Sequence, residues 1–164
     1  EMRAVLPMSP LGVRPAVVSA GPGAAQLLVS VAGLEASQAL ACVLVPESAY
    51  GGGRQSVAGA TVIANASVTG RATAACSVEG LRPGAWALFM SPNGGVELSA
   101  GSAPLRVRQA MRVTGIWPEV AADSGGAAIA VAGAHFEQDA STSCIVGGVL
   151  SAAVFVSPQE LRCR

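Results

Sequence analysis

Lysine is absent from the 164-residue chain, and charged residues of either sign are scarce. Ten arginines balance ten acidic residues, and charged residues make up only 12% of the sequence, about half of the usual quarter. Without lysine the chain has neither a Walker-type phosphate loop nor Schiff-base chemistry. Because clustered cations are missing as well, the sequence predicts no binding of nucleic acid through a basic face.

Two long stretches without charge, residues 15–34 and 140–159, have the length of a membrane helix but not its character. The first is interrupted by Gly21-Pro22-Gly23, and the second mixes serine, threonine, Gly147-Gly148 and β-branched residues in short alternating runs. Such runs are typical of strands. The 51% hydrophobic content also argues against a disordered tail. We therefore expect no membrane insertion in this segment.

Four isolated cysteines, Cys42, Cys76, Cys144 and Cys163, form no CxxC pair. Metal sites usually need such close pairs, whereas single cysteines on separate strands suit disulfides. Of the three pairings that four cysteines allow, Cys42 with Cys76 and Cys144 with Cys163 keeps each bridge inside its own half of the chain. The alternative is four buried free thiols in a cytosolic protein.

The favoured disulfides predict an oxidising compartment, outside the cell or at its surface. One sequon, Asn65-Ala66-Ser67, is a candidate N-glycosylation site and fits that compartment. The alanine-rich, lysine-free composition also resembles that of cell-surface and ciliary glycoproteins of green algae. If that likeness holds, the serine-adjacent prolines Pro10, Pro92 and Pro158 are candidates for hydroxyproline glycans.

An internal repeat appears when the chain is laid on itself with a shift of about one hundred residues. Residues 17–22 then face 113–118, a short strand ending in proline, and residues 28–33 face 128–133, an alternating strand closed by a glycine. Each copy next reaches its first cysteine, Cys42 or Cys144, and later its second, Cys76 or Cys163. The spacing within a pair is 34 residues in the first copy and 19 in the second. We attribute the surplus to an inserted glycine-rich loop at about residues 48–60.

The first copy continues beyond its second cysteine with elements that the second copy lacks. These are predicted strands at residues 86–90, 96–98 and 105–108, with a hairpin signal at Asn93-Gly94. The predicted fold is all-β: two tandem β-sandwiches, the second truncated. The expected boundaries are a linker or the end of a preceding module at 1–13, a first domain at 14–110, and a second domain at 111–164 that is incomplete at its C-terminus.

The second copy resembles an IPT/TIG domain, the immunoglobulin-like module of plexins, fibrocystin-type receptors and some transcription factors. The residues that carry the resemblance are 113–118, Ser124-Gly125-Gly126 before the strand 129–131, Gly133-Ala134-His135-Phe136, and the two cysteines. The family favours asparagine at the position of His135. The first copy resembles the family more loosely through Pro22, Gly33, its cysteines and the hairpin of residues 84–95. Intracellular members bind DNA or dimerise through basic loops, which are missing here, so the resemblance implies the extracellular, receptor-like members.

Residue patterns for catalysis are absent or weak. Asp123-Ser124-Gly125-Gly126 is similar to the surroundings of a protease nucleophile, but the single histidine, His135, follows it by only eleven residues. We interpret Ser124 as a turn residue and His135 as a loop residue. No carboxylate pair suits hydrolysis, and no aspartate cluster suits calcium. The sequence predicts neither an enzyme nor a metal or cofactor site.

A few residues are candidates for an interaction surface. Trp86 and Trp117 could stack on sugar, although core packing is the favoured interpretation for both. Arg106, Arg108 and Arg112 form the nearest approach to a basic patch. They are interpreted as the solvent side of an edge strand or as a charged contact at the domain junction. Tyr50 is the aromatic residue of the inserted loop, which is either a binding tip or a loop without a role.

Together these observations predict a non-catalytic structural and adhesion module of a large extracellular or cell-surface glycoprotein. It would act as a spacer and as a surface for other proteins, for further modules of the same chain, or for glycans. Two alternatives remain open: an accessory, carbohydrate-binding or spacer module of a secreted enzyme, and an intracellular dimerisation module.

Overall fold

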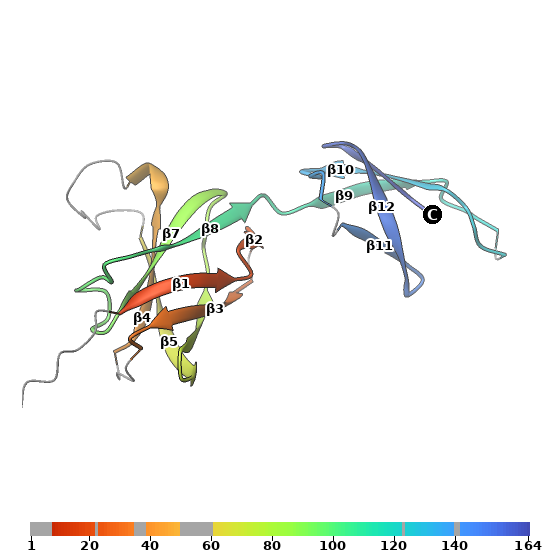
Figure 1. Ribbon diagram of the computed structural model, residues 1–164. Coiled ribbons are helices and arrows are strands. Elements are labelled where there is room, and N and C mark those ends of the chain that lie inside the picture. Colours follow the sequence, from red (N-terminus) through yellow and green to blue (C-terminus); the bar gives the residue numbers. More distant parts are fainter. Residues whose placement is uncertain (1–7, 22, 35–38, 50–60, 123, 140–141) are drawn as a thin grey trace, which may run out of the picture. The chain divides into compact units, whose positions relative to one another are not determined.

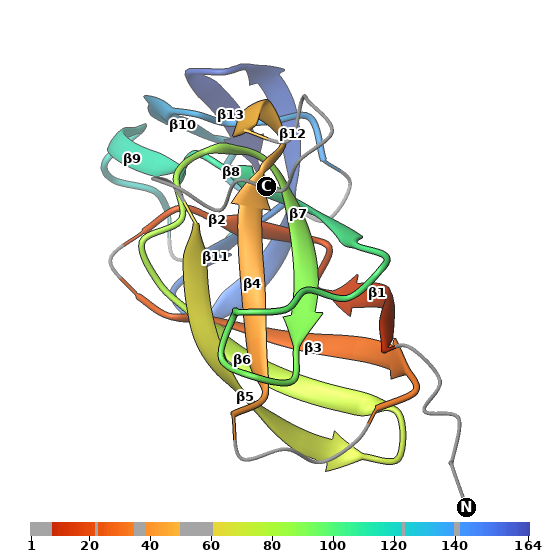
Figure 2. The same cartoon turned by 90° about the vertical axis from the view of Figure 1, so that its left-hand side faces the viewer.

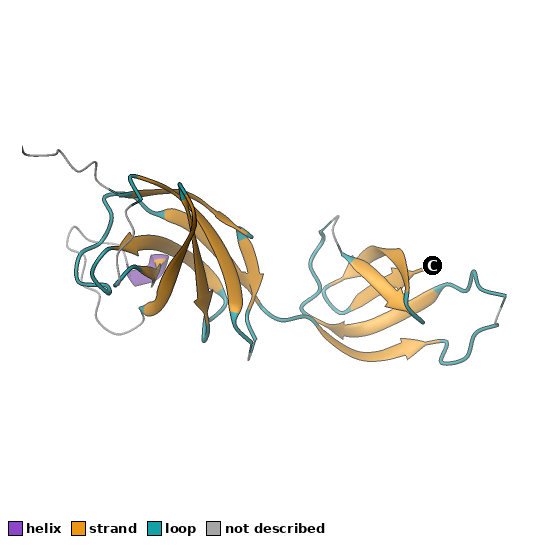
Figure 3. Ribbon diagram, turned by 90° about the horizontal axis from the view of Figure 1, so that it is seen from below, coloured by secondary structure: helices purple, strands orange, loops and turns teal. Residues whose placement is uncertain are grey.

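The computed structural model describes residues 8–21, 23–34, 39–49, 61–122, 124–139 and 142–164. Their regular structure is strand, apart from one turn of 3₁₀ helix, η1 (Glu47–Ala49) (Figure 3), so the predicted all-β class is confirmed. The chain divides into two compact units, Glu1–Gln109 and Ala110–Arg164. Each unit is described by itself.

The first unit is an eight-stranded β-sandwich whose strands follow the order β1-β3-β6-β5-β4-β7-β8-β2 (Figures 1 and 2). All neighbours are antiparallel except β2 and β8, which are parallel. The strands are β1 (Ser9–Arg14), β2 (Val17–Ser19), β3 (Ala25–Ala32), β4 (Ala41–Pro46), β5 (Val62–Gly70), β6 (Thr73–Val78), β7 (Gly84–Ser91) and β8 (Ala103–Arg108).

Strand β5 passes from one sheet of the sandwich to the other. Its residues 62–65 pair with β4, whereas its residues 66–70 pair with β6. The two sheets therefore share this strand, and the chain turns the corner between Asn65 and Ala66. Corners of this kind are how strands switch sheets in packed β-structures.

The larger core cluster lies between the two sheets, and in most strands alternation determines which residues enter it. In β3, for example, Leu27, Val29 and Val31 are buried while their neighbours Leu28 and Ser30 are exposed. Strands β7 and β8 close the other side with Trp86, Leu88, Met90, Leu105 and Val107. Strands β4 and β7 are instead buried on both faces, and their residues Val43, Val45, Ala87 and Phe89 form a second, smaller cluster.

Three sequence expectations for this unit need correction. Residues 9–13, expected in a linker or preceding module, pair with β3 as part of β1. Residues 96–98, expected as a strand, lie in the loop between β7 and β8, and the Asn93-Gly94 turn is not a tight hairpin. That loop is held by side chains instead: the Ser91 hydroxyl accepts a hydrogen bond from Gly95 N (2.8 Å), and Asn93 Oδ1 accepts one from Glu97 N (2.8 Å). The predicted edge strand, β8, is flanked by the short β2.

The second unit is a five-stranded structure with the order β11-β12-β13-β10-β9. Strand β12 divides as β5 does, because residues 149–152 pair with β11 and residues 153–157 pair with β13. The strands are β9 (Arg112–Trp117), β10 (Ile129–Ala134), β11 (Ser143–Val146), β12 (Val149–Ser157) and β13 (Glu160–Cys163).

Register shows that this frame repeats β1-β3-β6-β5-β4 residue by residue. Cys42 pairs with Ala64 and Cys144 with Ser151, while Cys76 pairs with Ala66 and Cys163 with Ala153. Each register irregularity recurs as well, in β1 and β9 and again in β5 and β12. We call this shared arrangement the five-strand frame.

The same registers correct the predicted alignment of the repeat at its first strand. Strand β9 corresponds to β1, so the proline equivalent to Pro118 is Pro15, not Pro22. Both prolines follow their strand through a cis peptide bond. The sequence comparison had matched residues 17–22 instead, because the apolar residues of β2 also precede a proline.

The turn glycine of the first frame is also shifted relative to the predicted match. In the registers of the two frames, Val29 is equivalent to Val131. Gly33 (φ 67°) therefore corresponds to His135 (φ 63°), and Val31 corresponds to Gly133. Asparagine tolerates this left-handed conformation better than most residues, which explains the family preference at His135. A Cβ on Gly133 would overlap the ring of the buried Phe136, which occupies the space of a side chain there.

We expect Gly133→Ala to destabilise the second unit by about 2 kcal/mol, since the added methyl group would collide with the Phe136 ring and the Arg112 carbonyl oxygen. Gly115→Ala is the matched control, because a Cβ at that position meets nothing within 4 Å. Urea unfolding followed by Trp117 fluorescence, in a background that lacks Trp86, would measure both variants. Equal midpoints for the two variants would contradict the assigned packing of Phe136.

The β11–β12 hairpin leaves much apolar surface open. Its residues 143–157 include no charged side chain, and Ile145 is 72% exposed and Leu150 67% exposed. Strand β11 is the last strand of its sheet. An apolar edge strand without charge or proline is prone to pair with other chains.

We predict that the 164-residue chain self-associates at rising concentration and that Ile145→Lys weakens this association. The lysine would place a charge on the otherwise uncharged edge. Leu11→Lys is the control, because Leu11 is also 72% exposed but lies on β1 of the first unit. Sedimentation velocity would compare the three proteins. An equal decrease for both variants would show that added charge alone, and not the β11 edge, determines association.

Candidate functional site

Each disulfide links the two sheets of its unit, by joining the two strands that flank the strand shared by both sheets, β5 or β12. Cys42 on β4 is bonded to Cys76 on β6, with a Cα–Cα distance of 6.3 Å, and Cys144 on β11 to Cys163 on β13, with 6.1 Å. The crossing strand presents small residues beside each bridge, Ala64 and Ala66 in the first unit. In the first unit the bridge is fully buried, and Met90 Sδ lies 3.6 Å from Cys42 Sγ.

Asn65 lies at the corner where β5 changes sheets. It pairs with Ala41 and is exposed, while the preceding Ala64 is buried. The alternation of the strand thus directs the amide of the sequon away from the core. Ser67, the hydroxyl residue of the sequon, is exposed on the same strand.

The three candidate arginines are divided between the two units. Arg106 is exposed and Arg108 half-buried on β8, where Leu105 and Val107 face the core. Strand β2 pairs with them along the backbone, since Arg106 N donates to Ala16 O at 2.9 Å. Arg112 begins β9 and belongs to the second unit.

The remaining candidates fall in different places. Tyr50 and most of the inserted loop, residues 50–60, lie outside the described residues. Trp117 is 74% exposed, so the expected core packing is wrong for it; the residue occupies the outward position of β9, equivalent to Arg14 of β1. Ser124 is an exposed turn residue, and His135 is exposed next to the buried Phe136.

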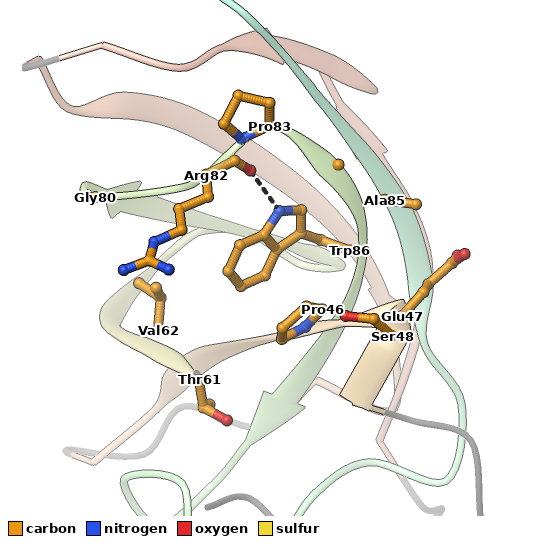
Figure 4. Close-up of a pocket in the computed structure, with 11 residues that line it drawn as sticks. Pro46, Glu47, Ser48, Thr61, Val62, Gly80, Arg82, Pro83, Ala85 and Trp86 are labelled. Carbon is orange, nitrogen blue, oxygen red and sulfur yellow. Dashed lines mark hydrogen bonds between the residues drawn. The ribbon is translucent and has the colours of Figure 1, made fainter. Parts of the chain in front are cut away.

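Trp86, for which core packing was also expected, is 5% exposed and belongs to the core cluster. Its indole also lines a cavity of about 700 Å³ at one end of the first unit (Figure 4). Three segments far apart in the sequence meet there: the end of β4 with η1, the start of β5, and the turn before β7. The lining residues are Pro46, Glu47, Ser48, Thr61, Val62, Gly80, Arg82, Pro83, Gly84, Ala85 and Trp86.

Hydrogen bonding fixes the orientation of the indole in this cavity. Trp86 Nε1 donates to the carbonyl oxygen of Arg82 at 2.9 Å, so the polar atom of the ring is satisfied within the protein. Figure 4 shows the Arg82 guanidinium on the Val62 side of the ring and Glu47 on the opposite side. The cavity therefore has an apolar wall with the Arg82 guanidinium beside it, while the Glu47 carboxylate points away from the ring.

Sequence reasoning singled out Trp86 but missed Arg82, Glu47 and Thr61. The available signal was the Arg82-Pro83-Gly84 turn directly before Trp86, which places a cation near an aromatic ring. Residues 46–48 and 61–62 carried no such signal, because only strand pairing brings them to this turn.

The described part of the chain contains no group of three or more histidine, cysteine, aspartate or glutamate side chains arranged to hold a metal ion. Within the same residues, no helix is long and apolar enough to cross a membrane.

Removing either disulfide should destabilise its own unit. We expect C42A/C76A to lower the free energy of unfolding of the first unit by about 2–4 kcal/mol. In the chain-entropy model, the longer separation of 34 residues, against 19 in the second unit, makes the first bridge worth about 0.5 kcal/mol more than the second. Denaturant unfolding would read the first unit through Trp86 and the second through Trp117, each in a background lacking the other tryptophan. Unchanged midpoints in C42A/C76A and C144A/C163A would contradict a stabilising role.

Comparison with known proteins gives a family match for the second unit. No curated protein matches the chain. Residues 111–164 match the family model of the IPT/TIG domain, a non-catalytic immunoglobulin-like module that mediates protein–protein interactions. The match spans β9 to β13, which is the whole second five-strand frame. Residues 111–164 are thus similar to an IPT/TIG domain, and the resemblance drawn from their sequence is confirmed.

Proposed function

We propose that this chain is a non-catalytic spacer and protein-interaction segment of a larger extracellular or cell-surface glycoprotein. The observation that carries the proposal is the repetition of one disulfide-linked five-strand frame in two consecutive units. Rigid sandwiches in series are suited to holding a distant binding site at a fixed spacing, and IPT/TIG domains contact other proteins.

The first unit is, on this proposal, a diverged copy of the same module. Its frame has the registers of the second unit, and its cysteines occupy equivalent positions. Strands β2, β7 and β8 and the insertion at about residues 48–60 are then its additions. Arg106 and Arg108 on β8, Arg112 on β9, and Tyr50 remain candidates for contacts with other proteins or with further modules.

The paired cysteines support the proposed compartment. Disulfides persist in oxidising surroundings and are rare in the cytosol. Asn65 is exposed at a corner of the sandwich, where an attached N-glycan would not disturb the core. The proposed location is the cell surface or the extracellular space, with the ciliary surface as the specific proposal drawn from the composition.

A second candidate function is an accessory carbohydrate-binding role beside a secreted enzyme. The cavity of about 700 Å³ beside Trp86 favours it, because hydroxyl and charged residues are among those that line this cavity. In contrast, an intracellular dimerisation role would require free thiols, and all four cysteines are paired in the structure.

Peptide mapping of protein from its native source would test the proposal. After alkylation without reductant, we expect linked peptides joining Cys42 to Cys76 and Cys144 to Cys163, and a glycan on Asn65. A reduced sample is the control, since it must release all four cysteines. Alkylation of all four cysteines before reduction would overturn the extracellular assignment. Intact disulfides with bare Asn65 would keep the compartment and overturn the glycosylation site.

A further inference from the structure

Strand β11 of the second unit has a neighbour on one side only among the described strands, whereas its equivalent in the first unit has two. That equivalent is β4, which pairs with β5 on one side and with β7 on the other. Backbone hydrogen bonds support the equivalence, because Ala66 N donates to Leu40 O in the first unit and Ala153 N donates to Thr142 O in the second. The position that β7 occupies beside β4 therefore has no described occupant beside β11.

Apolar residues that are buried in the first frame are exposed at the equivalent positions of the second. Leu44 on β4 is fully buried in the core cluster to which β7 and β8 contribute, whereas its equivalent on β11, Val146, is 50% exposed. Val13 on β1 is buried in the same cluster, whereas its equivalent on β9, Ile116, is 49% exposed. The second frame thus presents as open apolar surface what β7 and β8 cover in the first.

Backbone groups at the outer edge of β11 are oriented to accept a strand. Thr142 and Ala153 form a hydrogen-bonded pair between β11 and β12, and successive residues of an antiparallel strand direct their backbone groups to opposite sides. The N–H and C=O of Ile145 therefore face away from β12. Val43 on β4, the equivalent of Ile145, is paired with Phe89 of β7.

The first unit also shows the chemistry of a strand that fits this edge. Strand β7 is apolar on both faces: Leu88 enters the core cluster between the sheets, and Phe89 packs in the smaller cluster on the opposite face. A strand added to β11 in the same register would place its counterpart of Phe89 beside Ile145 and its counterpart of Leu88 beside Val146. Charged side chains at these two positions would be buried without partners, so the fitting strand is apolar.

A second copy of the chain does not have such a strand to offer, because its β7 is already paired with β4 and β8. Extended peptides are known to bind proteins by adding a strand to a free sheet edge. We propose that the second unit is an acceptor for a donated apolar strand, which pairs antiparallel with β11 in the register of β7 on β4. This inference rests on the interaction role proposed above and specifies the chemistry of the partner.

Strand acceptance would be tested on the 164-residue chain with a synthetic peptide of residues 84–92, lengthened by lysines for solubility. We expect saturable binding in fluorescence anisotropy of the labelled peptide, and amide NMR shifts at residues 143–146. N-methylation of the peptide at Phe89 should weaken binding about tenfold, because the N–H at this position faces β4 in the first unit. N-methylation at Leu88 is the matched control, since that N–H faces β8 and would be free in the complex.

Ile145→Pro is the corresponding change in the chain. Proline removes the N–H that faces the free edge and leaves the hydrogen bonds to β12 in place, so peptide affinity should fall about tenfold. Ile145→Val keeps that N–H and is the matched control, with an affinity within about twofold of the unchanged chain. Thermal unfolding would verify that each variant is folded, and the N-methylated peptides test the same hydrogen bond on the unchanged chain.

The absence of saturable peptide binding would overturn the proposal. Equal binding of the two N-methylated peptides would also overturn it, because adsorption to apolar surface does not depend on which backbone N–H is blocked. Self-association that persists at saturating peptide would assign the edge to a second copy in place of a donated strand. Each of these results leaves the spacer role intact, since that role rests on the disulfides and the repeated frame.

Discussion

Both units depend on the corner at which one strand passes from one sheet to the other and a disulfide links the two sheets. Strand β5 pairs with one sheet up to Asn65 and with the other after it, so its backbone joins the two ladders. The disulfide between β4 and β6 closes the same corner from the inside. Alanines at the inward positions of β5 leave room for the two sulfur atoms, which larger side chains would occupy. A chain with only 4% aromatic residues has few large side chains to hold two sheets together, so a covalent link at this point replaces part of the core.

The repetition of this corner explains the differences between the two copies. Where the first frame has Val31, the second has Gly133, and Phe136 from the following turn fills the space. Where the first has a glycine in the left-handed conformation, the second has His135. The register is preserved although the side chains differ, because backbone pairing and the disulfide determine the frame, and packing is compensated locally.

The five-strand frame and the cavity at Trp86 are built from different elements. The five-strand frame carries the family likeness and the disulfides, while the cavity at Trp86 is built from segments around the frame and from β7, which belongs only to the first unit.

The amino-acid sequence by itself determined the all-β class, the paired cysteines of each half and the existence of the repeat, because these depend on local alternation and on spacing along the chain. It also indicated the IPT/TIG likeness of residues 111–164. Only the tertiary structure decided that β1 belongs to the first sandwich, that Pro15 and not Pro22 matches Pro118, and that residues 96–98 form a loop. Those outcomes depend on which strands become neighbours, and several short apolar runs had similar patterns. The Trp86 cavity could not be predicted from the sequence for the same reason. Pairing of β4 with β5 and β7 brings Glu47, Thr61 and Arg82 to one cavity, and no local sequence pattern indicates that they lie close together.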